Sequence, residues 1–134
     1  MTIKNRQLLE TELSLVRDQR ATKRLSWVAP ETARGAEEAL TWLLAGRPSP
    51  APLSESRLDP TLADDVRRES DFAEQVWFGS VPGRGLSAKA TSGNVSQYAH
   101  GVSKTLGWAC GASEDDAFGR DDEDIREDAS ELVG

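Results

Sequence analysis

The glycine-rich segment 79–93 is the first part of the chain in which chemistry is to be sought, because glycine-rich loops cradle phosphate groups. The G-x(4)-G-K-[ST] spacing of a P-loop is absent from it. Residues 83–88 match G-x-G-x-x-A, but that pattern binds a dinucleotide only between a strand and a helix, and no strand is predicted here. We therefore interpret 79–93 as a loop, in which Arg84 and Lys89 are candidate contacts for an anion at the start of the next helix.

His100 and Cys110 are the only histidine and the only cysteine of the chain. A histidine that acts as a general base needs an orienting carboxylate and a nucleophile nearby, whereas its helix neighbours are Ser96, Ser103 and Lys104. Cys110 falls at the expected C-terminal end of a helix, where the helix dipole disfavours a thiolate. A single cysteine also excludes an internal disulfide and a multi-thiolate zinc site. We predict no catalytic residue.

The acidic tail, residues 112–134, has two basic and ten acidic side chains and a net charge of −8. The spacing of an EF-hand calcium loop cannot be placed on it, so we expect neither a specific metal site nor any other cofactor. Phe118, Ile125 and Leu132 are spread among the carboxylates, a composition typical of segments that become ordered on a partner. The alternative is a solvated tail that contacts nothing.

The rest of the chain is close to neutral. The whole protein has a net charge of −7, yet residues 1–111 hold 14 basic and 13 acidic side chains. The first 28 residues carry a net charge of +3, to which Arg17, Arg20, Lys23 and Arg24 contribute. The overall acidity is therefore no argument that the body repels nucleic acid.

Helices must position these residues, because no run of alternating β-branched residues is long enough to predict a strand. With 134 residues, 37% of them hydrophobic, the chain has room for one small domain with a lean core. The first helix is predicted over 5–24, with apolar residues at helical spacing: Leu8, Leu9, Leu13, Leu15 and Val16. Of these, Leu9, Leu13 and Val16 form the predicted partner-binding stripe, together with Arg17, Arg20 and Arg24.

The second helix is predicted from Pro30 to Gly46, and the prolines of segment 47–53 then favour an extended linker. The third helix is expected to start with Asp59 as its N-cap and to end near Gly79. The fourth is expected from Ser92 or Asn94 to Gly111, and a short terminal helix is conceivable over 121–133. The prediction is an all-α fold: a bundle of about four helices over 1–111, followed by the acidic tail.

Two predicted helices share the pattern A-x-G-x(4)-L-x-W-x(2,3)-G, in residues 33–46 and 99–111. A small residue lets a partner helix approach, and leucine and tryptophan cover the seam. Convergent packing or a duplicated helical hairpin would explain the pattern. It resembles the L-x-W-x-x-G helix ends of short helical proteins from GC-rich actinobacteria and their phages, a resemblance that carries no function across.

These observations favour a non-enzymatic interaction or assembly protein that binds another protein or its own copies, as an accessory or structural component of a phage or mobile element. Its contacts would be the stripe of the first helix and Phe118, Ile125 and Leu132. No stretch suits a membrane span or a secretion signal, so we expect a cytoplasmic protein or one within a phage particle. The alternative is a nucleic-acid-associated factor whose basic first helix is regulated by the acidic tail. An enzyme acting on an anion at Arg84, Lys89 and His100 is a third hypothesis.

Overall fold

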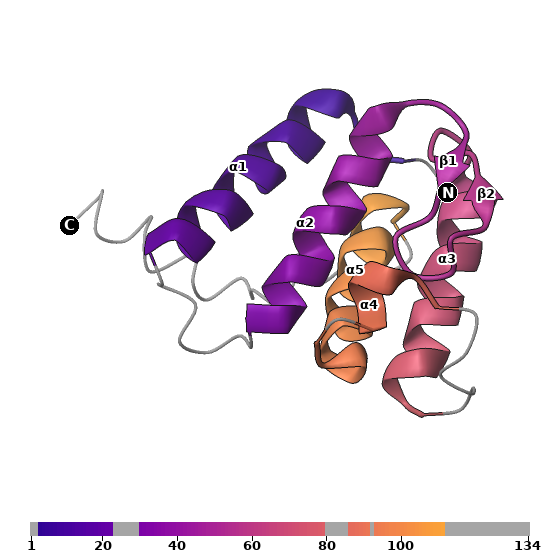
Figure 1. Cartoon of the computed structure of the whole chain (residues 1–134). Coiled ribbons are helices and arrows are strands. Elements are labelled where there is room, and N and C mark those ends of the chain that lie inside the picture. The colour runs from indigo at the N-terminus through magenta and orange to yellow at the C-terminus, as the bar shows by residue number, and fades with distance from the viewer. Residues whose placement is uncertain (1–2, 23–29, 80–85, 92, 112–134) are drawn as a thin grey trace.

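A computed structural model describes residues 3–22, 30–79, 86–91 and 93–111 (Figure 1). It confirms the all-α prediction with four long helices: α1 (Arg6–Thr22), α2 (Pro30–Ala45), α3 (Ala63–Trp77) and α5 (Val95–Ala109). A four-residue helix, α4 (Ala88–Thr91), precedes α5. A small antiparallel hairpin of β1 (Ser49–Pro50) and β2 (Arg57–Leu58) joins α2 to α3.

The long helices lie in the order α1, α2, α5, α3, so the centre of the body is formed by two helices that are far apart in the sequence (Figure 1). The main contacts are those of α2 with α5, α3 with α5, and α1 with α2. Leu40, Val102 and Leu106 of the central helices have no exposed surface, and Val16 of α1 and Val66 of α3 are equally buried. Helices α1 and α3 are therefore the two outer members of the row.

The two glycines of the shared pattern lie at the contact between α2 and α5. A Cβ atom on Gly35 would collide with the carbonyl oxygen of Tyr98, and one on Gly101 would collide with the carbonyl oxygen of Thr32. Each colliding carbonyl belongs to the residue three positions before the opposite glycine. The contact is thus reciprocal, with a local pseudo-twofold relation between the helices. The shared pattern is what brings two helix backbones into direct contact.

The ends of the helices agree with the sequence in most places. The Asn94 side chain accepts the backbone N–H of Gln97 and caps α5, as expected. Gly46, which follows α2, has a positive φ of 68°, the conformation that glycine adopts at helix C-termini. The predicted start of α3 is wrong. The helix begins at Ala63, because Asp59 forms a separate turn in which its Oδ1 accepts the N–H and hydroxyl of Thr61.

Segment 47–53, predicted as an extended linker, is extended only at β1, continues into the hairpin turn and is packed into the body. Ala51 and Leu53 are buried, and Trp42 donates its indole N–H to the Ser49 carbonyl. The buried carboxylate of Glu69 accepts the backbone N–H groups of Leu53 and Ser54, at 2.8 and 2.9 Å, and also the Ser54 hydroxyl. Glu69 thus ties the hairpin to α3.

Candidate interaction surface

The predicted partner-binding leucines on α1 point into the protein. Leu9 and Leu13 are buried and Val16 is completely covered, all within the core that α1 shares with α2. Their spacing at i, i+4 and i+7 correctly indicated an apolar face, but the chain itself covers that face. The stripe named from the sequence is therefore not a free surface.

A second apolar stripe remains on the outer side of α1. Leu8 is 47% exposed and Leu15 is 38% exposed, although both are large aliphatic residues. They are seven residues apart, close to two helical turns, so they lie on one side of the helix. We call this pair the outer stripe. Single exposed leucines are ordinary, but these two share one face of the helix, with Thr11 and Glu12 at the positions between them.

Arginines line the C-terminal half of α1 and bind α2. Arg17 Nε lies 3.2 Å from Glu37 Oε1, and Arg20 pairs with the other oxygen of the same carboxylate. The Arg17 side chain is still 57% exposed, so this ion pair is open to solvent. Arg24, the third predicted arginine, lies outside the described residues.

The start of α1 lies beside the end of α5. The backbone N–H of Lys4 donates to the carbonyl of Ala109 at 2.7 Å, and the Lys4 ammonium lies 5.3 Å from the centre of the Trp108 ring. Gly111, two residues further along, ends the described part of this region. Residue 112 therefore follows directly from a point next to the N-terminal end of α1.

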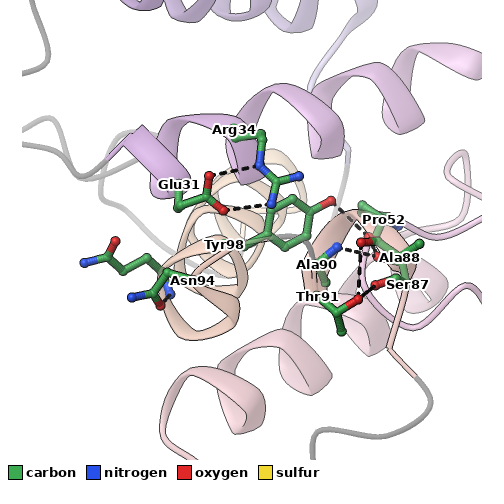
Figure 2. A network of polar contacts seen from close by, with 10 residues as sticks. Glu31, Arg34, Pro52, Ser87, Ala88, Ala90, Thr91, Asn94 and Tyr98 are labelled. Carbon is green, nitrogen blue, oxygen red and sulfur yellow. Dashed lines mark hydrogen bonds and ion pairs between the residues drawn. The ribbon is translucent and has the colours of Figure 1, made fainter.

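A polar network joins the N-terminal ends of α2 and α5 (Figure 2). Arg34 makes two hydrogen bonds to the Glu31 carboxylate, at 2.8 and 3.2 Å, and its guanidinium lies 4.5 Å from the centre of the Tyr98 ring. The hydrogen bonds from Arg34 hold the pKa of Glu31 below its usual value, whereas burial raises the pKa of Tyr98. The Tyr98 hydroxyl donates to the Pro52 carbonyl at 3.0 Å, and the Ser87 hydroxyl donates to the same oxygen. This network fastens the hairpin to α5.

His100 lies beside a small cavity of about 260 Å³ between α3 and α5. Its ring stacks on Trp77 with centroids 4.0 Å apart, and burial, together with nearby Lys104, lowers its pKa. Asp71 and Glu74 of α3 also line the cavity. Spacing along the sequence does not predict that they are neighbours of His100, because they belong to a different helix. Among the described residues the ring has no hydrogen-bond partner, so the orienting contact of a general base is missing.

A larger groove of about 420 Å³ lies between α2 and the hairpin. Trp42, Pro50 and Pro52 supply its apolar walls, and the carboxylates of Glu38 and Glu55 lie at its margin. Sequence reasoning missed this groove because its two walls come from segments separated by a turn. The prolines themselves were the available signal, since Pro50 and Pro52 form part of the groove wall.

The remaining predicted residues have no common site. Lys89 belongs to α4, and Arg84 lies outside the described residues, as do Phe118, Ile125 and Leu132. Cys110 is buried in the last turn after α5, with its thiol 3.8 Å from the Gly107 carbonyl. In the described part of the chain, no three side chains of histidine, cysteine, aspartate or glutamate gather closely enough to hold a metal ion.

None of the described helices has both the length and the apolar character required to cross a membrane. In comparisons with known protein families, with characterised proteins and with solved structures, nothing matches the chain.

Proposed function

We propose that this chain is a non-enzymatic interaction or assembly protein and that the outer stripe of α1 is its binding surface. The observation that carries the proposal is the exposure of Leu8 and Leu15 on one face of an outer helix whose neighbouring face is buried in the core. Leucines seven residues apart occupy the same heptad position, so they can both pack against one partner helix.

A second copy of the chain fits this surface as the partner. A stripe along one helix is self-complementary when two copies pair about a twofold axis, because the same residues then face each other.

The nucleic-acid alternative has less support. It relies on Arg17 and Arg20, and both already bind Glu37. A phosphate would have to compete with that carboxylate for two of its four proposed cations. The enzyme hypothesis, in turn, lacks an orienting partner for His100 among the described residues. A phage or mobile-element setting stays a prediction from the sequence.

The experiment is sedimentation velocity over a range of protein concentrations. We expect the wild-type chain to form dimers, and Leu8→Gln combined with Leu15→Gln to weaken the association by at least about tenfold, or 1.4 kcal/mol. Both side chains are partly exposed, so the double variant is expected to keep its fold, which circular dichroism would verify.

Leu62→Gln is the matched control, because Leu62 is 53% exposed but precedes α3 on the other side of the body. It should associate like the wild type. A wild-type chain that stays monomeric at every concentration, or a double variant that dimerises normally, would contradict the proposal.

A further inference from the structure

We infer that the acidic tail, residues 112–134, docks on the outer stripe of α1 in its own chain and competes there with the partner. This inference rests on the proposed function, since it names the regulation of the same surface. Three observations support it: the place where the tail starts, the spacing of its apolar residues, and its charge.

The tail starts beside the N-terminal end of α1, the helix that carries the outer stripe. Because Lys4 is bonded to Ala109, the chain leaves α5 next to the first turn of α1. Helix α1 has 17 residues and is about 25 Å long. A tail of 23 residues extends about 34 Å even when fully helical, so it reaches the whole outer stripe without leaving the body.

The apolar residues of the tail have the spacing of the stripe. Phe118, Ile125 and Leu132 are seven residues apart, as are Leu8 and Leu15. A tail that becomes helical along α1 therefore presents one apolar residue to each leucine. The short helix over 121–133 is marginal by itself, so it needs such a surface in order to form.

The charges agree with a tail that runs from the start of α1 toward its end. Helix α1 has no acidic residue in its first turn, and Glu114, Asp115 and Asp116 would supply negative charge at that positive end of the helix dipole.

Hydrogen exchange measured by mass spectrometry on the full chain tests the docking directly. At low micromolar concentration we expect amides in 112–134 to exchange at least about fivefold more slowly than in a synthetic peptide of the same sequence. The slowing should disappear in the Leu8→Gln, Leu15→Gln variant and persist in Leu62→Gln. Absence of slowing would overturn the inference, as would slowing that appears only at high protein concentration, which would mean docking between copies.

Sedimentation of a second full-length variant separates this inference from the proposed function. Phe118→Ser, Ile125→Ser and Leu132→Ser together remove the apolar contacts of the tail, and we expect about tenfold tighter dimerisation than in the wild type. If the wild type dimerises through the outer stripe but this variant dimerises no more tightly, the regulation is wrong and the proposed function stands. If neither chain dimerises, the proposed function fails, and the exchange result alone decides whether the tail docks.

Discussion

The centre of the body and its α1 edge are held by different kinds of contact. At the centre, α2 and α5 approach until Gly35 and Gly101 leave no room for a Cβ atom against the opposite backbone. At the edge, α1 is held on α2 by aliphatic side chains and by the solvent-open ion pairs to Glu37. The central contact has almost no freedom to adjust, because backbone atoms cannot move out of the way as side chains can.

This difference indicates which part of the molecule can bind a partner without loss of the fold. The close contact between α2 and α5 specifies the fold, and a change in its shape strains the packed interior around it. An outer helix held by flexible side chains tolerates exposed leucines and a competing segment without loss of the fold. The predictions below test whether the centre is rigid and the edge adjustable.

The largest effect is expected for Gly101→Ala. The added methyl group would collide with the Thr32 carbonyl, and separating the helices should destabilise the protein by about 3 kcal/mol despite the better helix propensity of alanine. Urea unfolding followed by circular dichroism measures this change. Gln97→Ala, an exposed substitution on the same helix, should stay within about 0.5 kcal/mol of the wild type. A stabilised Gly101→Ala variant would show that the central contact is adjustable after all.

An intermediate effect is expected for Tyr98→Phe, which removes only a hydroxyl from the central helix. The Pro52 carbonyl keeps its hydrogen bond from Ser87, so the loss of stability should be about 1 kcal/mol. Adding Ser87→Ala leaves that buried carbonyl without either donor, and the double variant should lose more than the sum of the single losses. Urea unfolding of the four proteins gives this coupling, and strictly additive losses would contradict the shared acceptor.

The smallest effect is expected for Glu37→Gln at the edge. It breaks the ion pairs to Arg17 and Arg20, which are open to solvent, so the cost should be below about 1 kcal/mol and shrink further in high salt. Hydrogen exchange should accelerate in α1 while α5 is unchanged, since the substitution loosens one outer helix. A loss as large as that of Gly101→Ala would mean that α1 is as rigidly held as the centre.

The sequence predicts the helices well because local signals decide them. Periodic apolar residues, the Asn94 cap and the glycine after α2 each act within a few residues, and the structure agrees with all three. The start of α3 was misplaced because Asp59 and Pro60 suit a turn as well as a helix N-terminus. Segment 47–53 was misjudged because its burial depends on Glu69, sixteen residues beyond Leu53.

The surface was less predictable than the fold. Spacing along α1 identifies one broad apolar stripe, but only the position of α2 decides that Leu9, Leu13 and Val16 are inside and that Leu8 and Leu15 are outside. From the sequence alone, the shared glycine pattern indicates only that two segments are similar. Its role as a reciprocal backbone contact required knowing that the two helices are neighbours.

The bond between Lys4 and Ala109 also bears on the order in which the protein is assembled. It closes a loop of more than a hundred residues, for which the entropic cost of joining the ends is about 4 kcal/mol before any constant is added. A single hydrogen bond contributes about 1 kcal/mol and cannot close such a loop alone. We therefore expect the two ends of the body to meet only after α2 and α5 have docked and brought α1 with them. The point from which the tail starts thus exists only in a chain whose centre is already folded.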